Sequence, residues 1–168
     1  MSDTTSFSEI YEVFFSKITD DMYMELERED TEKLVGELFV NALHWFEFPR
    51  VDIYDYDSDT SSYNISLSKE EINIIAHYMI VEWLGQQLAS VENTRMKYSG
   101  SDFEFTSQAN HMQKLQSMKK DWERIGFHLQ RLYKRREKDN EGKVVPTMSH
   151  LMEPYGFEER AYTRRPSG

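Results

Sequence analysis

The chain contains no cysteine, and it has little glycine and proline: seven and four residues out of 168. Without cysteine there can be no disulfide, no thiolate metal site and no cysteine nucleophile. Folds built from many short strands need frequent turn residues. The low content of glycine and proline therefore favours helices. A chain of 168 residues is long enough for one domain with a buried core.

Long apolar runs are also missing. The most apolar stretch, residues 72–88, is interrupted by His77, Glu82, Gln86 and Gln87, so we expect no membrane span. Aromatic residues, in contrast, make up 14% of the chain, which is typical of a folded rather than a disordered protein.

Charge is distributed unevenly along the chain. Residues 1–75 hold 18 acidic and 5 basic residues, a net charge of −13, whereas residues 76–168 hold 12 acidic and 15 basic residues, a net charge of +3. This asymmetry predicts one acidic and one weakly basic face. Two solvated helical surfaces of different composition would give the same pattern.

Two helix starts are marked by capping boxes. Ser6 and Glu9 precede apolar residues at helical spacing, which predicts a helix over about 7–17. Ser68 and Glu71 begin another helix. Its broad apolar stripe predicts a central position with several neighbours, and consists of Ile72, Ile75, Ala76, Met79, Ile80, Trp83, Leu84 and Leu88.

Two more helices are expected, over about 31–45 and 106–137. Between the helix over 31–45 and the helix that begins at Ser68, residues 50–63 are predicted to form a loop in preference to a short strand. The helix over 106–137 would be about 45 Å long at 1.5 Å per residue, so part of it should project or pack on another subunit. Its expected inner side is Ala109, Met112, Leu115, Trp122, Ile125, Leu129 and Leu132.

Residues 139–168 combine prolines with large apolar side chains. A solvated tail seldom carries so many apolar groups, whereas an arm that docks on a partner does. We therefore predict an all-α fold with a helical bundle over 1–138 and an extended C-terminal arm over 139–168. The docking residues expected in the arm are Met148, Leu151, Met152, Tyr155, Phe157 and Tyr162.

The loop after the second helix carries four aspartates: Asp52, Asp55, Asp57 and Asp59. The alternation from Asp55 to Asp59 is similar to the opening of a calcium-binding loop. Such a loop needs glycine at position six and glutamate at position twelve, where this chain has Thr60 and Ser66. A solvated acidic loop is therefore favoured over a calcium site.

No pattern of catalytic residues stands out. The histidines are far apart, and none pairs with a glutamate at the helical spacing of a zinc protease. His77, on a mostly apolar helix, is predicted to be a core or interface histidine. The chain also has no phosphate-binding glycine loop, nucleophile elbow or dinucleotide fingerprint. We expect neither an enzyme nor a bound cofactor.

The later part of the long helix is basic. Nucleic-acid binding needs phosphate-neutralising charge on one face, but interspersed acids dilute the charge here. Contact with an acidic partner surface, including the N-terminal half of a neighbouring copy, is favoured instead. The residues expected on this lateral basic face are Lys120, Arg124, Arg131, Lys134 and Arg135.

One stretch resembles small structural proteins of tailed bacteriophages. It comprises YMIVEWLGQQL at 78–88, NTRMKYSGSD at 93–102 and FTSQANH at 105–111, and with the next helix to Arg136 it covers about a third of the chain. The resemblance implies a head-to-tail connector, also called a neck adaptor or head-completion protein. These are small helical proteins with a loop and an extended C-terminal arm that form a ring, commonly of twelve copies, under the portal.

The resemblance also implies partners and a location. Other copies of the chain, the portal protein and a tail or stopper protein would be bound, and double-stranded DNA would pass through the ring without sequence-specific binding. The protein would be made in the host cytoplasm and end in the virion neck, with no membrane contact. The four loop aspartates would face the lumen or the tail, since acidic walls let DNA slide. The arm would dock on the portal or a neighbour, and the acidic half and basic helix would form the lateral ring contact.

Two other functions fit the same sequence. One is a tail-completion or tail-terminator protein of the virion. The other is a cytosolic regulator that binds nucleic acid through the basic long helix.

Overall fold

The computed structural model describes residues 4–18, 28–98, 105–138 and 144–146. The chain divides into two compact units, residues 1–130 and residues 131–168. The described part of the first unit is built from helices and one very small hairpin, which confirms the predicted all-α fold.

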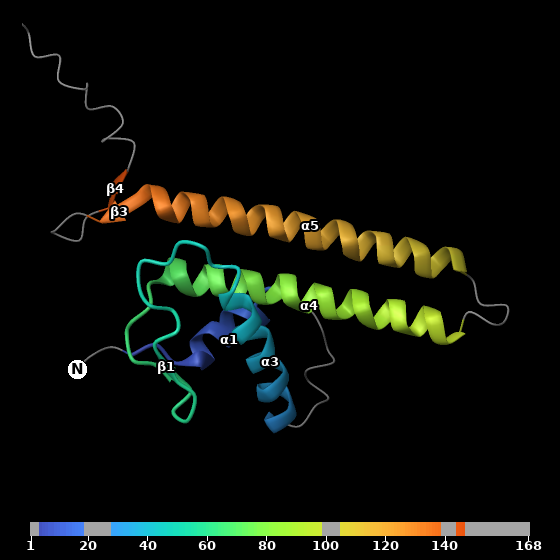
Figure 1. Cartoon of the computed structure of the whole chain (residues 1–168), viewed down its shortest axis with the longest axis horizontal. Helices are drawn as coiled ribbons and strands as arrows, with labels where there is room; N and C mark the ends of the chain where they lie inside the picture. The colour runs from blue at the N-terminus through green and yellow to red at the C-terminus, as the bar shows by residue number, and fades with distance from the viewer. Residues whose placement is uncertain (1–3, 19–27, 99–104, 139–143, 147–168) are drawn as a thin grey trace, which may run out of the picture. The chain divides into compact units, whose positions relative to one another are not determined.

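Four helices form the described framework: α1 (Phe7–Phe15), α3 (Arg28–Leu43), α4 (Lys69–Tyr98) and α5 (Phe105–Arg135). α1 and α3 both pack against α4. α5 runs antiparallel beside α4, on the side away from α1 and α3 (Figure 1). Residues 99–104, between α4 and α5, lie outside the described residues.

Both predicted capping boxes are present. The backbone N–H of Ser6 donates to Glu9 Oε1 at 3.3 Å, and the Ser6 side chain accepts from the first turn of α1. At α4, the Glu71 N–H donates to Ser68 Oγ at 3.3 Å, and Ser68 N–H donates to Glu71 Oε2 at 2.7 Å. These reciprocal bonds satisfy backbone donors that have no partner within the helix.

The bounds of α1 and α3 differ from the sequence prediction. α1 ends at Phe15 instead of residue 17, because Ser16 and Lys17 form a turn in which Ser16 Oγ donates to Val13 O at 2.7 Å. α3 begins at Arg28 and ends at Leu43, whereas residues 31–45 were expected. The backbone N–H groups of Trp45 and Phe46 bond three residues back, so the chain tightens into a turn before Pro49.

The core is centred on the first half of α4. Nearly every residue from Glu71 to Val81 is buried, as the broad apolar stripe predicted. Burial falls after Leu84: Gln86, Ala89 and Ser90 are exposed. The later half of α4 and the start of α5 therefore form a two-helix extension beyond α1 and α3 (Figure 1).

The segment over 50–63 is mostly irregular, as expected, but it contains a short hairpin. Strands β1 (Tyr56–Asp57) and β2 (Ser62–Tyr63) pair antiparallel, with Tyr56 opposite Tyr63. The stretch before α1 joins the hairpin, because Tyr63 N–H donates to Thr5 O at 2.8 Å and Phe7 N–H donates to Ser61 O at 2.9 Å. Loop and first helix are thus fixed to each other.

The described part of the second unit consists of the end of α5 and a second hairpin. Strands β3 (Arg136–Lys138) and β4 (Val144–Pro146) pair antiparallel. The helix expected over 106–137 therefore ends at Arg135, where the chain turns to strand. Within the expected arm, the strand Val144–Pro146 is therefore hydrogen-bonded to Arg136–Lys138. The predicted docking residues lie outside the described residues: Met148, Leu151, Met152, Tyr155, Phe157 and Tyr162.

Candidate interaction surfaces

A glycine sets how closely α5 approaches α4. A Cβ added at Gly126 would lie 2.8 Å from Tyr78 Cζ and 3.0 Å from His77 Cδ2. Real Cβ atoms do not come that close to a ring, so any residue other than glycine needs a shift of the Tyr78 and His77 rings or of the helices. The contact fixes Gly126 on the inner side of α5.

Gln130 fixes the same side one turn later. Its side chain is 2% exposed and makes three hydrogen bonds. Gln130 Nε2 donates to Tyr78 Oη at 2.6 Å and to Trp45 O at 2.8 Å, while its Oε1 accepts from Glu47 N–H at 2.8 Å. One amide therefore joins α5 to α4 and to the turn that follows α3.

His77 forms the third contact between α4 and α5. Its Nε2–H donates to the carbonyl oxygen of Trp122 at 2.7 Å. The centroids of the His77 and Trp122 rings lie 4.5 Å apart. Burial lowers the pKa of His77, partly offset by the bond to Trp122 and reinforced by Lys17. His77 was predicted to be a core or interface histidine, and the structure places it in the core, since the residue is 3% exposed.

These three contacts determine which side of α5 faces outward. Apolar residues recur on α5 at alternating spacings of three and four, the pattern of a helix with a helical partner, at Leu115, Met118, Trp122, Ile125 and Leu129. Leu115 is buried, but Met118 is 39% and Ile125 is 45% exposed. Trp122 and Leu129 are half-buried, and the Trp122 ring contacts His77 of α4. We call the two exposed residues of this series, Met118 and Ile125, the α5 seam.

The expected inner side of the long helix is therefore partly wrong. Ala109 and Ile125 are exposed, whereas Gly126 and Gln130 occupy the line that faces α4. Periodicity identified the apolar residues correctly. It could not show that a glycine and a glutamine, neither of them apolar, would rotate the helix toward their own side.

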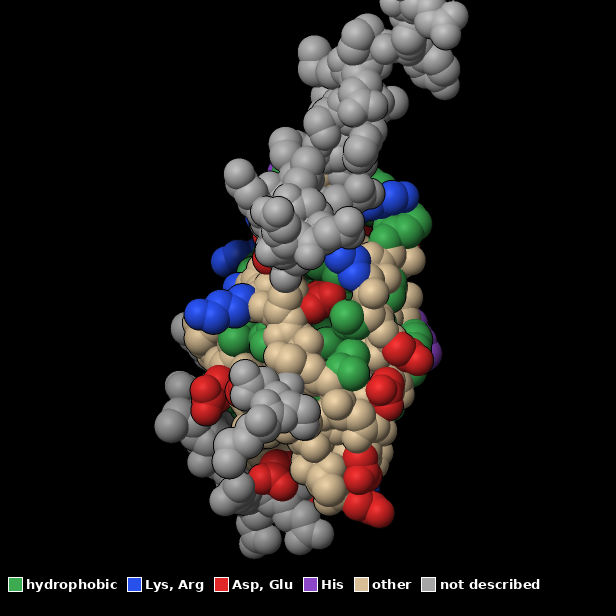
Figure 2. All heavy atoms as spheres, turned by 90° about the vertical axis from the view of Figure 1, so that its left-hand side faces the viewer, with side chains coloured by type: hydrophobic (Ala, Val, Ile, Leu, Met, Phe, Trp, Pro, Cys, Tyr) green, Lys and Arg blue, Asp and Glu red, His purple; other side chains and the backbone are tan. Residues whose placement is uncertain are grey.

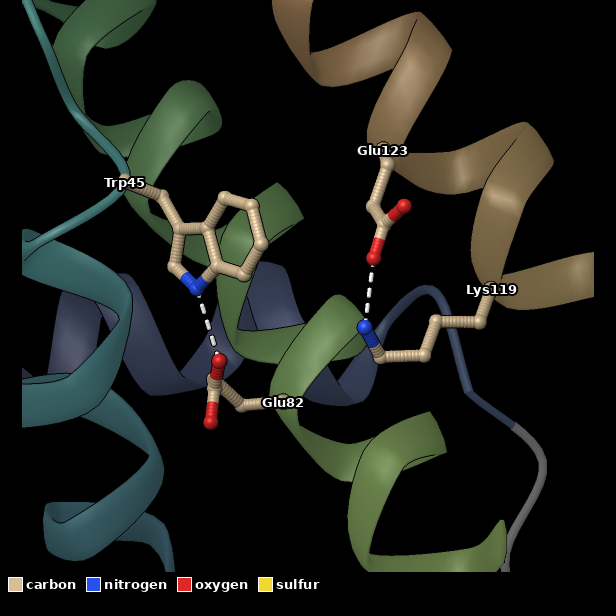
Figure 3. Close-up of polar contacts among 4 residues, drawn as sticks. All are labelled: Trp45, Glu82, Lys119 and Glu123. Atoms are coloured by element: carbon tan, nitrogen blue, oxygen red, sulfur yellow. Dashed lines mark hydrogen bonds and ion pairs between the residues drawn. The ribbon is translucent and has the colours of Figure 1, made fainter. Parts of the chain in front are cut away.

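A polar cluster around Trp45 covers another part of the α4–α5 contact (Figure 3). The Trp45 Nε1–H donates to Glu82 Oε1 at 2.7 Å, and the indole stacks on the Tyr78 ring at 5.7 Å between centroids. Lys119 Nζ lies 5.6 Å from the centre of the Trp45 ring and pairs with Glu123. A cation near an aromatic face is an attractive contact, so Lys119 of α5 stabilises the contact with Trp45 in addition to its ion pair with Glu123.

A pocket of about 590 Å³ opens between α1, α3 and the β1–β2 hairpin. Four rings line it, those of Phe7, Tyr11, Phe39 and Tyr56, and we call it the aromatic pocket. Its volume lies in the range of ligand-binding sites. No sequence pattern predicted this pocket, although Phe7 and Tyr11, four residues apart, indicate an aromatic helix face.

The polar edge of the aromatic pocket comes from α3. Lys33, Gly36 and Glu37 belong to its lining, and the nearest atom that a Cβ at Gly36 would meet is Tyr11 Oη, at 3.8 Å. Burial raises the pKa of Tyr11 to about 12, and the charge of Glu32 adds to this effect. The Tyr11 hydroxyl is therefore a neutral donor at physiological pH.

The loop aspartates shape their own loop. Asp52 Oδ1 accepts from Tyr54 N–H at 2.9 Å, and Asp57 Oδ1 accepts from Asp59 N–H at 2.9 Å. Asp55 Oδ1 accepts from Asn64 Nδ2 at 2.7 Å across the hairpin. Asp52, Asp55 and Asp59 remain exposed, and acidic side chains are visible on the face drawn in Figure 2. Across the described ranges, no group of three His, Asp or Glu side chains is placed to hold a metal ion.

The basic residues predicted on the long helix fall in both units. Lys120 and Arg124 are exposed on the first, where Arg124 Nη2 lies 3.3 Å from Asp121 Oδ1. An exposed pair of this kind adds little stability. The other three, Arg131, Lys134 and Arg135, are exposed on the second unit.

Comparison with known proteins gives no relative from which a role could be transferred: no family model, curated protein or solved structure matches the chain significantly. None of the helices in the described part of the chain combines the length and apolar character of a bilayer span.

Proposed function

We propose that this protein is a structural subunit of an oligomeric ring, a head-to-tail connector (neck adaptor) of a tailed bacteriophage virion. In this role, copies of the chain bind one another, the portal protein and a tail or stopper protein, and double-stranded DNA passes through the ring. The observation that carries the proposal is the exposed α5 seam. The phage assignment rests on the resemblance of residues 78–111 to such proteins.

The α5 seam supports an assembly role on energetic grounds. Fully burying one side chain of the size of Met118 or Ile125 contributes about 1.5–3 kcal/mol. Both are exposed on a helix whose apolar spacing is that of paired helices. A helix of a neighbouring copy would cover them. If the contact uses a different surface on that neighbour, successive copies are related by rotation and can close into a ring.

The charge distribution supports passage of DNA. Residues 1–75 carry a net charge of −13, and Asp52, Asp55 and Asp59 are exposed on the hairpin loop. An acidic lumen wall would repel phosphates and prevent the tight binding that a basic wall gives. Lys120 and Arg124, exposed on α5, are available to an acidic surface of a neighbour.

The test is the mass of the purified full chain by size-exclusion chromatography with light scattering, and by native mass spectrometry. We expect a ring-sized oligomer, alone or on addition of a portal ring. The double variant Met118→Glu/Ile125→Glu should be monomeric, because burying two carboxylates in the contact is unfavourable. Circular dichroism should show unchanged helix content, because both positions are exposed in the single chain.

The matched control is Gln113→Glu/Gln116→Glu. Both glutamines are exposed on α5 outside the α5 seam, and this variant adds the same charge. It should keep the oligomer of the unchanged chain. A wild-type chain that stays monomeric at all concentrations and never joins a portal ring would contradict the proposal.

A further inference from the structure

We propose that the aromatic pocket is a docking site for the segment Arg160–Arg165 of a second copy of this chain, with the Tyr162 ring in the pocket and arginines at its acidic edge. The inference rests on the proposed function, because it needs copies to meet. It adds a second, separate contact to that of the α5 seam.

The pocket is built for a ring or a flat cation. Phe7 meets Tyr56 edge to face at 5.5 Å between centroids, and Phe39 meets Tyr11 in the same way at 6.2 Å. Phe7 and Phe39 are buried and form the floor of the pocket, whereas Tyr11 and Tyr56 are half-buried, so their rings are partly accessible to a guest. Aromatic faces attract both other rings and guanidinium groups.

The pocket is also open to a partner. Val40, which belongs to its lining, is 43% exposed, and Gly36 contributes no side chain to fill it. Leaving this space unfilled at a helix interior costs helix propensity, since alanine would be favoured there by about 1 kcal/mol. The absence of a side chain at Gly36 leaves room for a side chain of the docked segment.

The charges around the pocket select a basic guest. Glu37 belongs to the lining, and Glu32 lies near enough to raise the pKa of Tyr11, against a single lysine, Lys33. Residues 159–168 have the complementary composition, with Arg160, Arg164 and Arg165 around Tyr162 and only Glu159 as an acid. Arginine pairs with carboxylates through two parallel hydrogen bonds, which fixes register as well as affinity.

Docking can be measured with a labelled peptide. The probe is a fluorescein-labelled peptide of residues 156–168, and the receptor is the full chain carrying Tyr162→Ala, Arg164→Glu and Arg165→Glu, so that its own segment does not compete. Fluorescence anisotropy should show saturable binding that weakens as salt is raised, because the arginine contacts are screened. Replacing tyrosine by alanine in the peptide should weaken binding at least tenfold.

Variants of the receptor test the pocket itself. Gly36→Leu fills the space beside Tyr11 and should weaken binding at least tenfold, and Glu37→Lys should do the same. The controls are Ala89→Leu and Glu92→Lys, two exposed positions on α4 that receive the same side chains. They should leave binding unchanged. No saturable binding, or binding that Gly36→Leu leaves intact, would overturn the proposal.

A cross-linking experiment decides between a second copy and the same chain. Val40 is replaced by the photoreactive p-benzoylphenylalanine in the otherwise unchanged full chain, which is mixed with isotope-labelled chain before irradiation. Cross-links from position 40 to residues 159–168 should join labelled to unlabelled chains. Cross-links confined to one isotope type would overturn docking between copies.

The two proposals fail separately. If the peptide does not bind while the unchanged chain still forms a ring that Met118→Glu/Ile125→Glu disrupts, only the docking site is wrong. If the peptide binds through the pocket but the chain never assembles, the proposed ring-forming function is contradicted and the docking site is not.

Discussion

The backbone of Gly126 on α5 lies so close to Tyr78 on α4 that a Cβ would stand 2.8 Å from the Tyr78 Cζ atom. Glycine in a helix interior costs about 1 kcal/mol relative to alanine. One turn later, Gln130 Nε2 donates to the hydroxyl of the same tyrosine at 2.6 Å. This rotation of α5 leaves Met118 and Ile125 on the outer side of the helix.

Gly126→Ala should destabilise the protein despite improving helix propensity. Forcing a methyl group into a packed contact costs about 1–3 kcal/mol, which outweighs the propensity gain in most of this range. Urea unfolding followed by circular dichroism measures the change. The control is Gly85→Ala, where the nearest atom to the new Cβ is the flexible Lys119 Cε at 3.4 Å. We expect Gly126→Ala to be about 2 kcal/mol less stable than Gly85→Ala. Equal stabilities would show that α5 does not depend on this contact.

Gln130→Met should also be strongly destabilising. Methionine fills a similar volume but leaves Glu47 N–H, Trp45 C=O and the Tyr78 hydroxyl without their partner amide, and each buried polar group left unpaired costs about 1–3 kcal/mol. Because these groups are partly buried, we expect a loss of about 2–3 kcal/mol in the urea unfolding free energy. The control Gln86→Met changes an exposed glutamine on α4 and should stay within about 0.5 kcal/mol of the unchanged chain.

A double-mutant cycle separates the Tyr78 hydroxyl from the rest of this network. Tyr78→Phe removes only the acceptor that lies 2.6 Å from Gln130 Nε2. The effects of Tyr78→Phe and Gln130→Met should therefore not add, with a coupling of about 1 kcal/mol. Strict additivity would mean that the 2.6 Å contact contributes nothing measurable.

Much of the fold follows from local sequence signals. The capping boxes at Ser6 and Ser68 placed two helix starts correctly, because cap chemistry depends on residues only three apart. The burial of α4 followed from its broad apolar stripe. The helix ends were less predictable. α3 ends at Leu43, where the next residues bond three back, and the turn that follows is held by Gln130, which bonds to Trp45 O and Glu47 N–H from a distant part of the chain.

The candidate surfaces depend on contacts between residues distant in sequence, so they were harder to predict. The aromatic pocket joins Phe7, Phe39 and Tyr56, which no spacing rule connects. The rotation of α5 is decided by Gly126 and Gln130, neither of which counts in an apolar pattern. The charge of the loop aspartates is evident from the sequence, but their local bonds are not: Asp55 Oδ1 accepts from Asn64 Nδ2 across the hairpin.

Acid should destabilise the protein through His77. Burial lowers the pKa of His77 in the folded state, whereas in the unfolded chain it is near the ordinary value of about 6.5. Above about pH 6.5 both states carry neutral imidazole, so His77 causes no pH dependence there. As the pH falls below this value, the unfolded state takes up a proton that the folded state does not, and stability decreases until the folded pKa is reached. The steepest slope that one such group allows is about 1.4 kcal/mol per pH unit.

The measurement compares the unfolding free energy at pH 7.5 and pH 5.5 for the unchanged chain and for His77→Gln. Glutamine keeps an N–H that can donate to Trp122 O but does not titrate in this range. His44, His111 and His128 are exposed and present in both proteins, so their effects cancel. The unchanged chain should lose about 1 kcal/mol more than His77→Gln over this interval. Identical losses in the two proteins would mean that His77 accepts its proton as readily in the fold as in the unfolded chain. That result would contradict the buried, neutral imidazole that donates to Trp122.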